Sequence, residues 1–97
     1  MNMQAMLKEA QKIQKEMMNE QEKINTAEFI GKSSLVTIKM NGKKEITDVK
    51  ISDKVDLEDL EMLQDMIMIA HNDAVKQIDN EIAEKMGKYT KGMPGLF

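Results

Sequence analysis

The alternation of apolar and polar residues between positions 34 and 52 predicts a β-hairpin. The two runs are joined by Asn41-Gly42, the strongest short-range hairpin signal, because both residues tolerate the positive φ angles of a two-residue type I′ turn. In that register Ile38 faces Glu45, and one side of the hairpin is apolar and half-buried. This side carries Val36, Ile38, Met40, Thr47, Val49 and Ile51.

A helical pattern precedes the hairpin, from about Asn2 to Ile24, in a stretch without Gly or Pro. Apolar residues recur there at spacings of about three and four, as on one face of a helix. They are Met3, Met6, Ala10, Ile13, Met17 and Ile24. The opposite side of this helix carries four lysines, which we call the lysine stripe. At about 100° per residue they lie within a sector of about 80° around the helix axis. The stripe consists of Lys8, Lys12, Lys15 and Lys23. Such an interleaved charged face is more often simply solvated than a binding surface.

Residues 29–31 can form a short first strand before a turn at residues 31–34, which gives three antiparallel strands together with the hairpin. A long helix follows, with Asp56 as a candidate N-cap, an end near Met86 and Gly87 as the cap beyond it. One apolar stripe of this helix carries Leu60, Leu63, Ile67, Ala70, Ala74 and Ile78, and another side carries Met62, Met66 and Ile69.

This element order predicts an α+β fold: N-terminal helix, three-stranded antiparallel sheet, long C-terminal helix (α-β-β-β-α). We expect a single domain over residues 1–87 and a flexible tail over residues 88–97. One helix and a small sheet can hardly bury a helix that is apolar on two sides, so a homodimer is expected. The predicted dimer-interface residues are Met62, Leu63, Met66, Ile67 and Ile69.

Composition narrows the chemistry. The 97 residues contain no cysteine and one histidine, His71, so a His/Cys metal site within one chain is not expected. No nucleophile lies at a spacing that would pair it with His71, and the chain has no Gly-rich phosphate loop. We therefore expect no catalytic residues, no cofactor, no small-molecule substrate and no enzymatic activity. The longest apolar run is too short to span a bilayer, which predicts a cytoplasmic chain without a membrane partner.

The formal net charge of −3 conceals an uneven distribution. Residues 55–86 contain nine acidic residues and two lysines, whereas the charged side chains of the last eleven residues are two lysines. All fourteen basic residues are lysine, so bidentate reading of guanine by arginine is excluded, and sequence-specific readout of bases becomes less favourable. From this charge count Lys88 and Lys91 are added to the lysine stripe as candidate phosphate contacts.

The order of these parts resembles the YbaB/EbfC family of bacterial nucleoid-associated proteins over nearly the whole chain. The fragments that carry the resemblance are a Gln/Lys/Met-rich first helix, the run Val36-Thr37-Ile38-Lys39-Met40-Asn41-Gly42, the pairs around Glu45-Ile46 and Val49-Lys50-Ile51, Leu57-Glu58-Asp59, the run Glu61-Met62-Leu63-Gln64-Asp65, Asn72-Asp73-Ala74, Lys85-Met86-Gly87-Lys88 and a Gly-Met-Pro-Gly tail.

The resemblance implies a tweezer-like homodimer at the nucleoid that binds double-stranded DNA with little sequence dependence and has no enzymatic activity. It implies that the helices carry DNA contacts, which assigns Lys8, Lys12, Lys15 and Lys23 to DNA binding. An alternative function of another class is a protein-binding adaptor or chaperone that grips a partner with Met-rich helix surfaces. Salt separates the two, because phosphate binding weakens steeply as salt rises and apolar docking does not.

Overall fold

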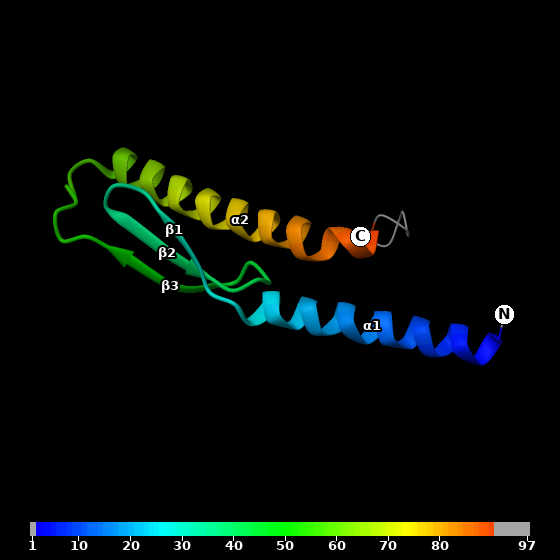
Figure 1. The fold of residues 1–97 in the computed structure, drawn as a ribbon. Coiled ribbons are helices and arrows are strands. Elements are labelled where there is room, and N and C mark those ends of the chain that lie inside the picture. The colour runs from blue at the N-terminus through cyan, green and yellow to red at the C-terminus, as the bar shows by residue number, and fades with distance from the viewer. Residues whose placement is uncertain (1, 91–97) are drawn as a thin grey trace.

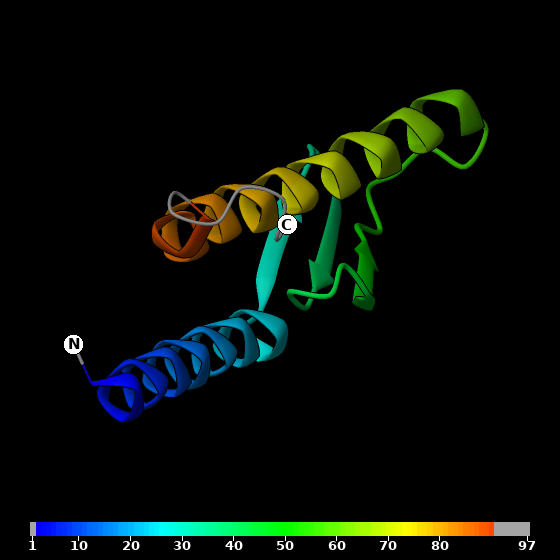
Figure 2. The ribbon, with the colours of Figure 1, turned by 90° about the vertical axis from the view of Figure 1, so that its right-hand side faces the viewer.

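The computed structural model describes residues 2–90. It consists of α1 (Met3–Thr26), β1 (Phe29–Lys32), β2 (Val36–Met40), β3 (Ile46–Ile51) and α2 (Leu60–Thr90). The strands form one antiparallel sheet in the order β1-β2-β3, with α2 lying across it and α1 extending away from one end (Figures 1 and 2). The predicted fold class, helix then three strands then helix, is confirmed.

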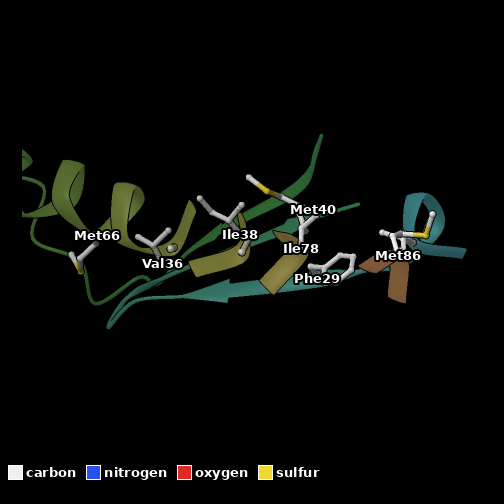
Figure 3. Close-up of a cluster of buried hydrophobic side chains, with 10 residues drawn as sticks. Phe29, Val36, Ile38, Met40, Met66, Ile78 and Met86 are labelled. Carbon is white, nitrogen blue, oxygen red and sulfur yellow. The ribbon is translucent and has the colours of Figure 1, made fainter. Parts of the chain in front are cut away.

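The core lies between α2 and one face of β1 and β2. Alternating residues of these strands are buried, and α2 contributes a stripe at helical spacing whose narrow members are Ala70 and Ala74. Burying a large aliphatic side chain contributes about 1.5–3 kcal/mol, so this interface supplies most of the chain's own stability. Figure 3 shows the side chains of this cluster and labels the larger ones. They are Phe29, Val36, Ile38, Met40, Met66, Ile78 and Met86.

Gly31 marks the closest approach of α2 to the sheet. A Cβ atom at this position would overlap the Ala70 carbonyl oxygen and the Ala74 backbone. The sequence predicts a turn from Gly31, but the structure places Gly31 inside β1, and the turn follows it, with the Ser33 N–H donating to the Val36 carbonyl at 2.9 Å. The glycine is required for helix–sheet contact rather than for a turn conformation.

The hairpin between β2 and β3 differs from the predicted two-residue turn. Val36 pairs with Ile51 and Ile38 with Val49, so the predicted pairing of Ile38 with Glu45 is wrong. The loop contains three residues between Asn41 and Glu45, and its positive φ angle of 65° falls on Lys44. The Asn41 side chain favours this longer loop because its Oδ1 accepts hydrogen bonds from the N–H groups of Lys43 and Glu45.

Gly42 serves a different purpose from the one predicted. A Cβ atom at Gly42 would overlap the Ile24 carbonyl, and the Gly42 N–H donates to the Asn25 carbonyl at 3.2 Å. The hairpin loop is therefore packed against the last turn of α1, where Ile24 is buried. This contact joins the first helix to the sheet.

The predicted limits of the long helix are wrong at both ends. Asp59, not Asp56, caps the start, because its Oδ1 accepts from the Met62 N–H at 3.1 Å, while Asp56 closes the preceding turn through the N–H of Glu58. At the other end α2 passes through Gly87 and ends at Thr90, so Gly87 is not a cap and residues 88–90 belong to the helix. The rest of the predicted tail, residues 91–97, lies outside the described residues.

The chain has a markedly extended shape. Its principal extents are 70 × 21 × 14 Å and its radius of gyration is 19.2 Å, whereas a compact chain of this length would have about 12.5 Å. The cause is visible in Figure 1: α1 runs beside the last part of α2, and its first turns reach beyond the end of that helix. We call α1 the arm, and we call α2 and the sheet the body of the chain.

Candidate nucleic-acid interface

The lysine stripe lies along the exposed side of α1. Asn2 caps this helix, its side chain accepting from the Gln4 N–H at 3.0 Å, and Lys8, Lys12 and Lys15 are all exposed. With Lys23 they extend over about 22 Å at 1.5 Å per residue. Lys23 lies 3.6 Å from the Glu20 carboxylate, with 75% of its own side chain exposed. In residues 2–90 no carboxylate lies within 4 Å of the other three amines.

The two predicted groups of lysines are on different helices. Lys88 is exposed in the last turn of α2, where its ammonium group lies 5.0 Å from the centre of the Tyr89 ring. Tyr89 lines a groove with the apolar side of α1, and at 100° per residue the α1 lysines point the opposite way. Within one chain, therefore, Lys88 does not extend the lysine stripe. Lys91 lies outside the described residues.

The open face of the sheet carries a second group of lysines. Lys32 and Lys39 alternate with the buried residues of β1 and β2, and Lys50 lies on the same face of β3, since Thr37 pairs with both Lys32 and Lys50. Lys39 is partly neutralised by Glu28 at 3.7 Å. The sequence analysis does not assign these residues to binding. The expected two-residue turn already places Lys39 and Lys50 on this face, because the two registers differ by an even number of residues, and the pairing of β1 with β2 adds Lys32.

The predicted dimer-interface residues fall into three environments. Met66 is 6% exposed and belongs to the chain's own core, so its assignment to a surface between two chains does not fit the structure. Leu63 is partly buried against the same core. Met62, Ile67 and Ile69 are exposed at 54%, 36% and 56%.

These three exposed residues occupy opposite flanks of α2. Asp73 and Gln77 identify the β1 side, because the Asp73 carboxylate accepts from the Lys32 N–H at 3.0 Å and the Gln77 amide donates to the Ile30 carbonyl at 2.8 Å. Met62 and Ile69 lie on that side by helical spacing, whereas Ile67 lies on the side toward β3.

Strand β3 leaves apolar side chains in solvent. Val49 and Ile51 pair with buried Ile38 and Val36 and so lie on the core face of the sheet, yet each is 45% exposed. The reason is that α2 packs over β1 and β2 and does not reach β3. The expected half-buried hairpin is therefore half-buried on β2 only. We call the exposed residues Val49, Ile51, Leu60 and Ile67 the β3 shelf.

Other candidate chemistry is sparse in the described part of the chain. His71 is partly exposed, and its Nδ1 lies 3.3 Å from the Asn72 side-chain oxygen. No group of three or more His, Cys, Asp or Glu side chains within residues 2–90 is arranged to hold a metal ion. Neither α1 nor α2, the two described helices, is long and apolar enough to cross a membrane.

One known protein family matches nearly the whole chain. Residues 1–93 match the model of the YbaB/EbfC DNA-binding family. The chain belongs to this family. YbaB/EbfC proteins are nucleoid-associated DNA-binding proteins rather than enzymes, which confirms the expectation of no enzymatic activity.

Individual YbaB/EbfC relatives agree with this assignment. A nucleoid-associated protein of Enterococcus faecalis is 50% identical over 98 residues, covering 98% of this chain and 94% of the relative. A nucleoid-associated protein of Bacillus licheniformis is 58% identical over 40 residues, a match that spans only 37% of that relative and 39% of this chain. The crystal structure of an uncharacterized Helicobacter pylori protein superposes with a TM-score of 0.70 at 28% identity, covering 98% of this chain and 99% of that one.

The structure gives physical roles to fragments on which the YbaB/EbfC resemblance rests. In Asn72-Asp73-Ala74, Asp73 binds the edge of β1 and Ala74 makes room for Gly31. In the fragment that ends with Asn41-Gly42, Asn41 shapes the loop and Gly42 admits the end of α1. These fragments thus specify how the elements pack, and the DNA-binding surface has to be sought on the exposed helices and sheet.

Proposed function

We propose that this YbaB/EbfC protein works at the nucleoid, in the cytoplasm, as a homodimer that binds double-stranded DNA with little sequence preference. The lysines of α1 supply the contacts, by electrostatic attraction to phosphates. The carrying observation is the protruding α1 arm, on which Lys8, Lys12 and Lys15 are exposed and have no carboxylate within 4 Å among residues 2–90. A helix about 10–12 Å wide also suits the width of a DNA groove or a path along one backbone.

Low sequence preference follows from the kind of cation. Lysine ammonium groups act as point charges on phosphates, which position a protein without reading base edges. The chain offers no arginine for bidentate recognition of guanine. Its net charge of −3 restricts favourable contact with DNA to surfaces where lysines gather, and α1 is such a surface.

The shape of the chain supports a homodimer. The accessible surface is 7486 Å², whereas a compact protein of 11.1 kDa would expose about 5,700 Å². The excess of roughly 1,800 Å² per chain falls within the area that obligate dimers bury. The β3 shelf supplies an apolar strip beside the core where a second chain would complete the cover that α2 gives to β1 and β2.

DNA binding is tested by measuring the anisotropy of a labelled random-sequence duplex at several salt concentrations. If the two arms contact about four to six phosphates, log affinity should fall with log salt at a slope of about −4 to −5. Changing Lys8, Lys12 and Lys15 together to Gln should weaken binding to all sequences alike and reduce that slope. Lysine and glutamine have similar helix propensity, so the helix should persist.

The matched control changes Lys32, Lys39 and Lys50 to Gln, which removes the same charge from the open face of the sheet. This variant should bind DNA nearly as tightly as the unchanged protein. If the control loses binding and the α1 variant retains it, the sheet is the DNA surface and the arm mechanism is wrong. If the unchanged protein binds no duplex at about 50 mM salt, an adaptor that binds other proteins replaces DNA binding as the function.

The dimer is tested by sedimentation of Val49→Lys/Ile51→Lys. Two charges on the β3 shelf should convert a dimer at low micromolar concentration into a monomer, because the charged groups would have to be desolvated between the chains. The control Met62→Lys/Ile69→Lys places the same charges on the opposite flank of α2 and should remain dimeric. A monomeric control with a dimeric shelf variant would assign the interface to that other flank, as the sequence pattern predicts.

A further inference from the structure

The apolar side of α1 forms a groove that no side chain of residues 2–90 fills. This α1 groove measures about 560 Å³ and ends against Tyr89 of α2. Within α1 it is lined by Met6, Glu9, Ala10, Ile13, Gln14 and Met17. Because the groove is apolar and has an acid at its margin, it does not suit a phosphate backbone.

The first half of α1 receives no packing from its own chain. Every residue from Met3 to Glu16 is exposed. An isolated helix of this length is marginally stable in water, because most helical stability in proteins comes from packing of an apolar face. A helix seated in the groove would therefore stabilise the part of the arm that carries Lys8 and Lys12.

The groove has the residue spacing of a coiled-coil seam. From Met3 to Met17 the apolar residues follow one another at alternating intervals of three and four residues. Glu9 and Gln14 flank them, at the positions that border the seam of a coiled coil. In such a seam each apolar residue enters a hole formed by four residues of the facing helix. The spacing therefore indicates that the occupant is a helix with the same pattern.

The charges at the margins are compatible with a second α1 in the parallel direction. In a parallel pair Glu9 of one helix faces Gln14 of the other, so no like charges meet there. In an antiparallel pair the flank that carries Glu9 and Glu16 would face itself, and the glutamates would repel one another. We propose that the α1 groove is the docking site for α1 of a second copy of this chain, with the two arms parallel.

This contact is separate from the β3 shelf. Strand β3 and the start of α2 lie at one end of the chain, whereas the first turns of α1 lie at the other (Figure 1). The seam is only about two heptads long and has Ala10 at its centre, which contributes little apolar area. Arm pairing is therefore weaker than the shelf contact and requires protein concentrations above the low micromolar range.

Parallel pairing turns the two lysine stripes away from each other. At 100° per residue Lys8 and Lys15 lie nearly opposite the groove on α1. Packed helices lie about 8–10 Å apart and are each about 10–12 Å wide, so the two stripes would be about 20 Å apart on the outer sides of the pair. Resting on the proposed function, this arrangement lets paired arms contact two separate stretches of phosphate backbone.

The absence of cysteine allows a direct test by disulfide formation. In the full-length variant Ala10→Cys the two thiols would face each other across the seam, and mild oxidation should link two chains, measured on a non-reducing gel. The control Gln11→Cys places the thiol on the next residue, which is exposed and does not line the groove. Because a disulfide needs Cα atoms within about 7 Å, the bond should form about tenfold faster in Ala10→Cys. Equal rates in the two variants would overturn the proposal.

Two matched substitutions in the Ala10→Cys chain test the seam itself. Met6 lines the groove and is 52% exposed, whereas Met18 is 62% exposed and does not line it. Met6→Gln should slow disulfide formation about tenfold, because it removes an apolar side chain from the seam, and Met18→Gln should change the rate less than twofold. Equal slowing by both would show that the groove does not hold the second arm.

The disulfide experiment needs no DNA, so its outcome is independent of the proposed DNA contacts. If Ala10→Cys links two chains and the Lys8, Lys12 and Lys15 variant keeps its DNA affinity, arm pairing stands and the lysine mechanism is wrong. If the lysine variant loses DNA binding while Ala10→Cys links chains no faster than Gln11→Cys, the lysine mechanism stands and arm pairing is overturned.

Discussion

Both helices carry apolar residues at helical spacing, but their structural roles are opposite. In α2, helical spacing brings buried side chains onto the sheet from Met66 to Ile78, and Met86 is buried beside the end of α1 (Figure 3). In α1, Ile24 is the one buried residue, and it lies in the last turn, against the hairpin loop. An amphipathic pattern thus identifies the apolar face of a helix. That face can pack against the rest of the same chain, as in α2, or lie beyond it, as in most of α1.

This difference assigns stability and function to separate regions. The body, α2 with β1 and β2, holds the described core, whereas the arm carries charges and few contacts of its own. Changes in the body should therefore alter the free energy of unfolding, and changes on the exposed arm should alter binding. The following substitutions test that division.

The largest effect is expected for Gly31→Ala. The added Cβ would meet backbone atoms of Ala70 and Ala74, which cannot move without separating α2 from the sheet. We expect a loss of about 4 kcal/mol in the free energy of unfolding, or failure to fold, measured by chemical denaturation. A loss below about 1 kcal/mol would show that α2 does not pack as closely on β1 as described.

Ile78→Ala and Leu7→Ala compare the body and the arm directly. Ile78 is fully buried, so its truncation leaves a cavity and should cost about 2–4 kcal/mol. Leu7 is 59% exposed and does not line the groove between the apolar side of α1 and Tyr89, so its truncation should change the free energy of unfolding by less than about 0.5 kcal/mol. Equal costs in thermal denaturation would mean that the arm is packed as fully as the body.

Gly87→Ala should stabilise the chain. Gly87 lies inside α2, and a Cβ atom there would have no neighbour within 4 Å. Alanine is the better helix former, so a gain of about 0.5–1 kcal/mol is expected from the midpoint of denaturation. A loss of stability would indicate that Gly87 ends the helix, as the sequence pattern first predicts.

The smallest effect is expected for His71→Gln. The ring is partly exposed and its described neighbour is the Asn72 side chain. Stability should change by less than about 0.5 kcal/mol and DNA affinity by less than about twofold. A large loss of DNA binding with unchanged circular dichroism would assign His71 a role in the interface.

The sequence by itself determined the order and type of every element. Unbroken helical spacing, strand alternation and the Asn41-Gly42 signal are local properties, so the α-β-β-β-α order could be predicted and the structure confirms it. The exposed lysines of α1 could be predicted for the same reason, because a stripe on one helix depends only on the 100° step between residues.

Tertiary structure decided what depends on residues far apart in sequence. The hairpin loop has three residues, with Gly42 against the Ile24 carbonyl and the Asn41 side chain closing the turn. The pairing of β1 with β2 brings Lys32 onto the open sheet face that carries Lys39 and Lys50. Met66 is part of the core while Ile67 remains exposed, because α2 packs over β1 and β2 and does not reach β3. The periodicity of apolar residues predicts only that one face of a helix will be buried. Which face is buried, and against which strands, depends on where α2 lies over the sheet and on how closely Gly31 lets the helix approach.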